Sequence, residues 1–186
     1  MLPPDFIKEA RALVFRRKGK FRRKQRMSAA PPRYWKKLGF GFFGEAWAHE
    51  DYPGLVVKIS GREGFGPGAR SRREPDLDGW PVFAEYCAAH PHPNLPNIMH
   101  FERLSPGVSF GIMPRYEKLK DCAIAYKWSC YLEGTKGAPA WMWPIIGMRG
   151  ALNMVVDLHG GNVMLDPATG EYIMTDPFSG TADSRC

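Results

Sequence analysis

Residues 155–180 read VVDLHGGNVMLDPATGEYIMTDPFSG, and no other stretch of the chain is as informative. Asp157 precedes Asn162 by five positions, and two short apolar runs joined by Asp-Pro-Ala-Thr-Gly lead from Asn162 to Asp176. The two runs predict a hairpin that folds Asp176 back beside Asn162. A plain hairpin with carboxylates on its solvated ends is the alternative.

The polar residues of this stretch suit the transfer of a phosphoryl group. That reaction needs a carboxylate to orient the attacking hydroxyl and oxygen ligands to hold Mg²⁺ against the phosphates. We expect Asp157 to orient the hydroxyl as a catalytic residue, and Asn162 and Asp176 to bind the metal. The stretch therefore predicts a site for metal and phosphate.

A second stretch, residues 38–60, reads LGFGFFGEAWAHEDYPGLVVKIS. Its glycines have the spacing G-x-G-x-x-G, and Lys58 ends a later apolar run; the glycines are Gly39, Gly41 and Gly44. Because a strand follows the motif, we expect a hairpin covering phosphates instead of the helix-opening turn of a dinucleotide-binding fold. The glycine amides would approach the anion closely, and Lys58 would reach the α and β phosphates. An ordinary glycine-rich β-turn is the alternative.

The order of glycine lid, strand lysine, Asp-x-x-x-x-Asn loop and late Asp resembles the signature set of protein kinases. Residues 38–60, LKDC at 119–122, DLHGGNVM at 157–164 and YIMTDPFS at 172–179 resemble the early serine/threonine protein kinase of T-seven-like podophages. The resemblance covers about residues 38–179. It implies an α+β, two-lobed protein-kinase-like fold with an antiparallel N-lobe sheet and a truncated, mainly helical C-lobe.

The same resemblance implies an activity and a setting. The cofactors would be ATP and Mg²⁺, and Lys58 and Asn162 would join Asp157 in the catalytic set. The substrates would be Ser or Thr hydroxyls on host transcription, translation or RNA-processing proteins, phosphorylated in the host bacterial cytoplasm early in infection. Val155 and Val156 stand where kinases usually carry His-Arg, so we expect activity without a phosphorylated activation loop.

Two further ATP-site residues follow from this scheme. A helix predicted from about Pro81 to Ala89 carries Glu85, the candidate that fixes Lys58 for ATP. Met113 begins a predicted hinge whose backbone and apolar wall would hold adenine.

The predicted domains are a basic extension at residues 1–37, a kinase-like N-lobe at 38–113 and a reduced C-lobe with the catalytic and metal-binding loops at 114–186.

Positive charge is concentrated at the N-terminus. The first 37 residues carry 13 Lys and Arg against 2 acidic residues, a net charge of +11, whereas the remainder carries 13 against 17, a net −4. Helical spacing predicts a short amphipathic helix that buries Phe6, Ala10, Leu13 and Val14. The block RRKGKFRRKQR at residues 16–26 follows and is expected to stay mobile.

This block is the candidate contact for RNA, DNA or a host polymerase, because its cations would release counterions from a polyanion. The cations are Arg16, Arg17, Lys18, Lys20, Arg22, Arg23, Lys24 and Arg26. A solvated tail with nonspecific attraction is the alternative.

We expect no membrane partner, because no apolar run is long enough to span a bilayer. The spacing of the 4 cysteines favours free thiols.

Three functions remain open at this stage. The first is a phage-type protein kinase. The second is a small-molecule kinase, favoured by the Asp-x-His-x-x-Asn form at residues 157–162. The third is a non-catalytic, kinase-shaped binder of a host polymerase or nucleic acid.

Overall fold

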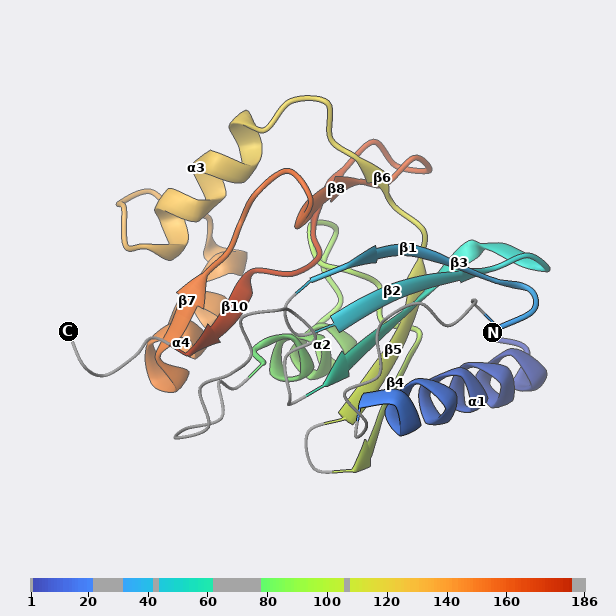
Figure 1. The fold of residues 1–186 in the computed structure, drawn as a ribbon. Coiled ribbons are helices and arrows are strands. Elements are labelled where there is room, and N and C mark those ends of the chain that lie inside the picture. The colour runs from blue at the N-terminus through green and yellow to red at the C-terminus, as the bar shows by residue number, and fades with distance from the viewer. Residues whose placement is uncertain (1, 22–31, 42–43, 62–77, 106–107, 182–186) are drawn as a thin grey trace. The chain divides into compact units, whose positions relative to one another are not determined.

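A computed structural model describes residues 2–21, 32–41, 44–61, 78–105 and 108–181 (Figure 1). The chain groups into two compact units: Met1–Pro75 with Ile98–Pro114, and Asp76–Asn97 with Arg115–Cys186. One boundary therefore lies between Pro114 and Arg115, in the segment predicted as a hinge. No helix in the described ranges is both long and apolar enough to span a membrane.

The first unit contains a five-stranded antiparallel sheet with the strand order β1-β2-β3-β5-β4. Its strands are β1 (Trp35–Phe40), β2 (Gly44–His49), β3 (Tyr52–Gly61), β4 (His100–Ser105) and β5 (Val108–Pro114). The glycine motif spans the hairpin between β1 and β2, as predicted. The antiparallel sheet and the α+β class are confirmed.

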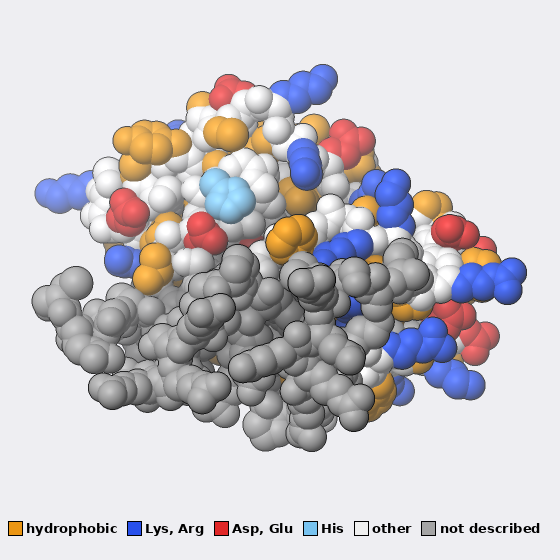
Figure 2. Space-filling model, in the orientation of Figure 1, with side chains coloured by type: hydrophobic (Ala, Val, Ile, Leu, Met, Phe, Trp, Pro, Cys, Tyr) orange, Lys and Arg blue, Asp and Glu red, His pale blue; other side chains and the backbone are white. Residues whose placement is uncertain are grey.

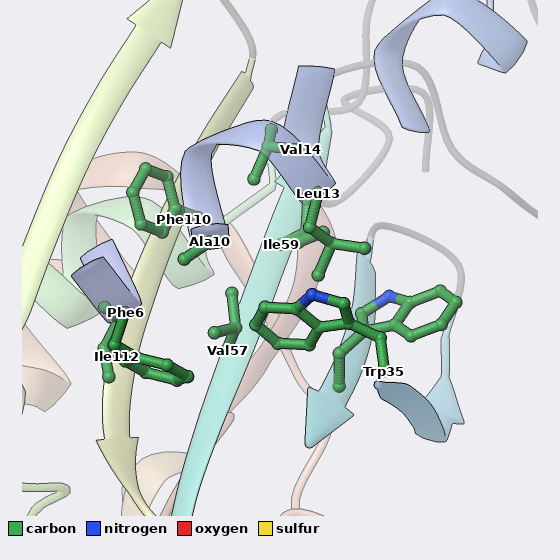
Figure 3. Close-up of a cluster of buried hydrophobic side chains, with 10 residues drawn as sticks. Phe6, Ala10, Leu13, Val14, Trp35, Val57, Ile59, Phe110 and Ile112 are labelled. Carbon is green, nitrogen blue, oxygen red and sulfur yellow. The ribbon is translucent and has the colours of Figure 1, made fainter. Parts of the chain in front are cut away.

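One face of this sheet is covered by α1 (Pro4–Phe21). Figure 3 shows α1 side chains directed at side chains from β1, β3 and β5. The buried residues of this core are Phe6, Ala10, Leu13, Val14, Trp35, Trp47, Val57, Ile59, Phe110 and Ile112. A fully buried side chain of this size contributes about 1.5–3 kcal/mol, so the core holds α1 firmly on the sheet. The four α1 positions predicted to be buried are confirmed.

Helix α1 is longer than the sequence pattern predicted. We expected the helix to end near Val14 and the basic block to be mobile from Arg16, but helical structure continues to Phe21. Arg17 is 7% exposed and bonds to a carboxylate on β2. The expectation was wrong for this part of the block because like-charge repulsion is offset where an acidic partner is buried under the helix.

The second unit combines helices with short strands. Its helices are α2 (Trp80–Ala89), α3 (Ala123–Leu132), the 3₁₀ turn η1 (Ala140–Met142) and α4 (Trp143–Leu152). Its strands are β6 (Glu117–Lys118), β7 (Met154–Val156), β8 (Val163–Leu165), β9 (Tyr172–Met174) and β10 (Phe178–Thr181). They form one sheet of order β6-β8-β9 and a pair of β10 with β7. The helix predicted from about Pro81 to Ala89 is confirmed as α2, which begins one residue earlier.

Local chemistry explains where two of these elements turn. Asn153 has a left-handed conformation with φ 48° and ends α4 just before β7. In the β8–β9 hairpin, Asp166 Oδ1 accepts the N–H of Ala168 at 2.9 Å, and Gly170 has φ 75°. Only a residue without a side chain adopts that φ at no steric cost. The predicted turn between the two apolar runs is therefore confirmed.

Candidate functional site

The second unit brings Asp157, Asn162 and Asp176 together through hydrogen bonds. The N–H of Asp176 donates to the Asn162 carbonyl at 3.3 Å, and Asn162 Nδ2 donates to the Asp157 carbonyl at 2.6 Å. The N–H of Asp157 donates to the carbonyl of Pro177 at 2.9 Å. Three residues separated by up to 19 positions are thus fixed on one backbone framework.

Short strands support this framework on both sides. Val156 of β7 pairs with Phe178 of β10, and Val163 of β8 pairs with Met174 of β9. Thr175 adds its N–H and hydroxyl to the Asn162 carbonyl at 2.8 and 3.0 Å. The loop that carries Asp157 is therefore tied to the segment that carries Asp176 before any ligand binds.

The orientation of the Asn162 amide decides which of its atoms can bind a cation. Because Nδ2 is occupied by the Asp157 carbonyl, Oδ1 is the atom that remains for an electrophile. One carboxylate oxygen of Asp176, Oδ1, is buried. An amide oxygen and a carboxylate are hard ligands of the kind that Mg²⁺ prefers.

These ligands suit Mg²⁺ better than a metal ion whose ligands all come from the protein. No group of three or more His, Cys, Asp or Glu side chains in the described part of the chain is arranged to hold a metal. Magnesium usually takes one or two carboxylates and completes its octahedron with water and phosphate oxygens. Asn162 and Asp176 match that small protein contribution.

The carboxylate of Asp157 remains accessible, with 44% of its side chain exposed. His159 Nε2 lies 4.0 Å from Asp157 Oδ1, which is too far for a hydrogen bond. The His159 ring instead accepts the Gly161 N–H on Nδ1 at 2.9 Å. A hydroxyl can therefore reach Asp157 without displacing a bonded partner from that oxygen.

The two glycines of this loop lie close to neighbouring side chains, which the motif alone did not show. A Cβ at Gly160 would lie 2.5 Å from Cys122 Sγ, and a Cβ at Gly161 would lie 2.8 Å from His159 Cε1. Both distances are well inside van der Waals contact, so neither position accepts a side chain without movement. Sequence reasoning missed Cys122 as a neighbour of the loop, although it lies in the LKDC segment.

In the first unit, two of the predicted phosphate-binding residues, Gly39 and Lys58, share one face of the sheet. Gly39 pairs with Ala46, Ala46 with Lys58, and Lys58 with Gly111, so these four residues form a row across four strands. Directly paired residues point to the same face. Val57 and Ile59 face α1, and alternation places Lys58 on the opposite face.

The neighbours of Lys58 in this row are small. Ala46 and Gly111 flank the lysine, and a Cβ at Gly39 would meet nothing within 4 Å. Met113 lies two residues from Gly111 on β5, so it belongs to the same face as Lys58. One face of the sheet therefore carries an ammonium group, glycines and an apolar side chain.

The three motif glycines differ in their surroundings. A Cβ at Gly41, like one at Gly39, would meet nothing within 4 Å, whereas a Cβ at Gly44 would lie 2.5 Å from the carbonyl oxygen of Ile59. None of the three has a positive φ. Gly44 is therefore required for the pairing of β2 with β3, and the other two leave open space.

Glu85, predicted to fix Lys58, lies exposed on α2 in the second unit. Lys58 lies in the first unit, and their pairing stays a prediction. Glu85 follows Ala84 and precedes Tyr86 on a helix that buries Trp80, Phe83, Ala84 and Cys87 on its other side.

The basic block is described only in part. Arg16 is exposed and Arg17 is buried; the side chains of Lys18, Lys20, Arg22, Arg23, Lys24 and Arg26 lie outside the described residues. Arg17 therefore does not belong to the exposed cations expected to contact RNA, DNA or a polymerase. On the visible face in Figure 2, Lys and Arg side chains of the described residues lie interspersed with Asp and Glu.

The described cysteines are free thiols, as predicted. Cys87 is buried, Cys130 is partly buried and Cys122 is exposed. Burial raises the pKa of the Cys87 thiol well above its ordinary range, so it stays protonated and unreactive. The fourth, Cys186, lies outside the described residues.

Comparisons with known proteins give limited similarity. No protein-family model and no curated protein matches the chain. Among solved structures it is similar to Rad53 1–466 in complex with AMP-PNP, with 16% identity and a TM-score of 0.38 over 76% of this chain and 36% of that one. It is also similar to the CAK complex from Chaetomium thermophilum bound to ATP-gamma-S, with 16% identity and a TM-score of 0.39 over 82% of this chain and 50% of that one.

The chain thus spans about a third of the length of the first matched chain and half of the second. Scores at this level do not establish a shared activity or ligand. The candidate site therefore stands on the contacts of its own residues.

Proposed function

We propose that the protein is an ATP-dependent, Mg²⁺-requiring phosphotransferase that acts as a serine/threonine protein kinase. The observation that carries the proposal is the hydrogen-bonded framework joining Asp157, Asn162 and Asp176. An ordinary hairpin with solvated carboxylates has no need to bond an Asn side chain to the Asp157 backbone. The framework instead leaves two oxygen ligands and one accessible carboxylate, which is the set that phosphoryl transfer requires.

Each residue has a role that its surroundings permit. Asp157 would orient the attacking hydroxyl and accept its proton, because its carboxylate is exposed and held by its backbone. Asn162 Oδ1 and Asp176 would hold Mg²⁺, which neutralises phosphate charge when bound. Lys58 would contact the α and β phosphates from its face of the sheet, with Glu85 orienting it.

The remaining ATP contacts would come from the same face as Lys58. Gly39 and Gly41 would allow close approach of phosphate oxygens to the backbone, since a Cβ at either position would meet no atom of the described residues within 4 Å. Met113 would pack against adenine. The proposal requires Lys58 and Asp176 to act on one nucleotide, and energetic coupling between them tests that requirement.

The identity of the acceptor rests on the resemblance to the podophage kinases. We propose host proteins of transcription, translation or RNA processing as substrates, phosphorylated in the host bacterial cytoplasm early in infection. A panel of mixed bacterial proteins, sugars and aminoglycosides, each with labelled ATP and Mg²⁺, separates this from a small-molecule kinase. Label on Ser and Thr of proteins alone supports the proposal, and label on the small molecules assigns the second class.

The decisive experiment compares Asp157→Asn with Asp166→Asn. The first variant keeps the backbone bonds of the loop but lacks the carboxylate, so transfer should fall at least a hundredfold. The second changes an Asp in the β8–β9 turn of the same unit, and an amide oxygen can still accept the Ala168 N–H. Equal transfer by wild type and Asp157→Asn would refute the assignment.

Binding measurements test the ATP and metal roles without depending on transfer. Calorimetry with ATP, with and without Mg²⁺, should show that Asp176→Asn and Asn162→Ala lose the metal-dependent part of the affinity. Lys58→Met combined with Asp176→Asn should be non-additive, because both residues contact one ligand. Additive losses would show that Lys58 and Asp176 do not act on one nucleotide.

A further inference from the structure

A buried carboxylate lies at the base of the turn from Gly41 to Gly44 between β1 and β2, which we call the glycine turn. Glu45 is 2% exposed and directly follows Gly44. It pairs with Phe40 of β1 and Ile59 of β3, so it is the first residue after the turn that both neighbouring strands hold in register. Its side chain points to the α1 face, away from the row that contains Lys58.

Cations from two elements hold this carboxylate. Arg17 of α1 donates from Nε to Oε2 at 2.9 Å and from Nη2 to Oε1 at 2.6 Å. Lys37 of β1 donates to Oε1 at 2.8 Å, and Trp47 Nε1 donates to Oε2 at 3.1 Å. Burial would raise the pKa of Glu45, but the bonds and charges of Arg17 and Lys37 outweigh it and lower the pKa. The carboxylate is therefore ionised and fully bonded.

The same cations also reach the aromatic side chains around the turn. Lys37 Nζ lies 4.7 Å from the ring centroid of Phe40, and the Arg17 guanidinium lies 5.2 Å from that of Trp47. The two ends of the turn, Phe40 and Glu45, are thus held by one ionic cluster. The turn itself is closed by the Gly41 N–H donating to the Gly44 carbonyl at 2.9 Å.

A buried ion pair is a poor way to add stability, because desolvation offsets most of its attraction and apolar residues of similar volume do as well. It is a good way to fix one geometry, since removal of either partner leaves a buried charge. A Cβ at Gly44 would lie 2.5 Å from the Ile59 carbonyl oxygen, so this end of the turn has no room for a side chain. The ionic cluster therefore holds the turn from the α1 face of the sheet.

We infer that Arg17 is a positioning residue for the glycine turn and acts through Glu45. Helix α1 is then part of the ATP-binding apparatus and not a detachable extension. The effect of Arg17 on ATP affinity rests on the proposed function. The effect of Arg17 on the geometry of the turn does not depend on that function.

The test uses Arg17→Lys and Glu45→Gln in the full chain, with Arg11→Met as the matched control. Arg11 also joins α1 to the sheet by an ion pair, to Glu102 of β4, at 2.7 Å. The control therefore weakens the docking of α1 without touching Glu45. Arg17→Lys keeps the charge and loses the two-pronged contact, so it is the variant most certain to fold.

The first readout is hydrogen exchange of the Gly41 amide by NMR without nucleotide. We expect exchange at least fivefold faster in Arg17→Lys and Glu45→Gln, and within twofold of wild type in Arg11→Met. Equal acceleration in all three variants, or none in the first two, would overturn the inference. This readout does not involve ATP.

The second readout is the split between KM for ATP and kcat. Misplacement of the turn should raise KM at least fivefold in Arg17→Lys with kcat within threefold, and Arg11→Met should change neither. If wild type neither binds nor uses ATP while the exchange result holds, the proposed function fails and the positioning role stands. If exchange is unaffected in Arg17→Lys, the positioning role fails whatever the kinetics show.

Discussion

The three glycines of the G-x-G-x-x-G motif should respond differently to the same substitution. At Gly44 an added Cβ would lie 2.5 Å from the Ile59 carbonyl oxygen, whereas ordinary contact begins at 3.4 Å. The obstacle is the backbone of a paired strand, which cannot rotate away. The strands β2 and β3 would therefore have to separate locally by about 0.9 Å, the difference between those two distances.

Overpacking of this kind costs about 1–3 kcal/mol. For a chain of 186 residues, each 1 kcal/mol lowers Tm by about 2–4 °C, so we expect Gly44→Ala to melt about 2–12 °C below wild type. The added methyl groups of Gly39→Ala and Gly41→Ala meet no atom of the described residues within 4 Å, and neither position needs a special φ. Their unfolding free energies should stay within about 1 kcal/mol of wild type, with a gain possible through the unfolded chain.

ATP binding should show the opposite order. If Gly39 and Gly41 are present to let phosphate approach the backbone, a methyl group there should weaken ATP binding at least tenfold, about 1.4 kcal/mol. The assay is differential scanning fluorimetry without ligand, followed by calorimetric titration with Mg-ATP. Unchanged ATP affinity in Gly39→Ala and Gly41→Ala would refute the phosphate role, and an unshifted Tm in Gly44→Ala would refute the packing argument.

Three further predictions concern Gly160, Glu45 and Arg11. Gly160→Ala should lose about 1–3 kcal/mol of stability because its Cβ meets Cys122 Sγ, and Cys122→Ala should restore most of that loss in thermal melts of the double variant. The pKa of Glu45 is lowered in the folded state. The stability that the ionised carboxylate provides is therefore present above the ordinary Glu pKa of about 4.3 and is lost as pH falls through the folded-state pKa. In urea melts, the difference in unfolding free energy between wild type and Glu45→Gln should shrink below about pH 4. Arg11→Met breaks an exposed pair and should cost at most about 1 kcal/mol in the same melts.

The sequence predicted those features that depend on periodic patterns or on turn residues. The glycine hairpin, the β8–β9 turn and the buried positions of α1 follow from alternation, turn chemistry and helical spacing. The pairings of β6 with β8 and of β7 with β10 were not predictable, because strands of two to four residues carry no measurable period. Tertiary contacts, and not local preference, set such pairs.

The candidate site could also be predicted only in part from the sequence. The spacing of Asp157, Asn162 and Asp176 was enough to predict that they lie together, since one hairpin connects them. It did not show how they are held, because the bonds run through backbone groups that every residue carries. Nor did it show that Cys122 limits the loop at Gly160, since the two positions are remote in sequence.

The burial of Arg17 was within reach of sequence reasoning. Arg17 follows Leu13 by four positions and Val14 by three, so it continues the apolar face of α1 into the basic block. On β2, Glu45 alternates with Trp47 and therefore points inward with it. A carboxylate on the buried face of a strand needs a cation from the element that covers that face, because an unpaired buried charge is strongly unfavourable. Helical spacing identifies Arg17 as the arginine of the basic block that lies on the buried face of α1. Strand alternation identifies Glu45 as the carboxylate that it meets.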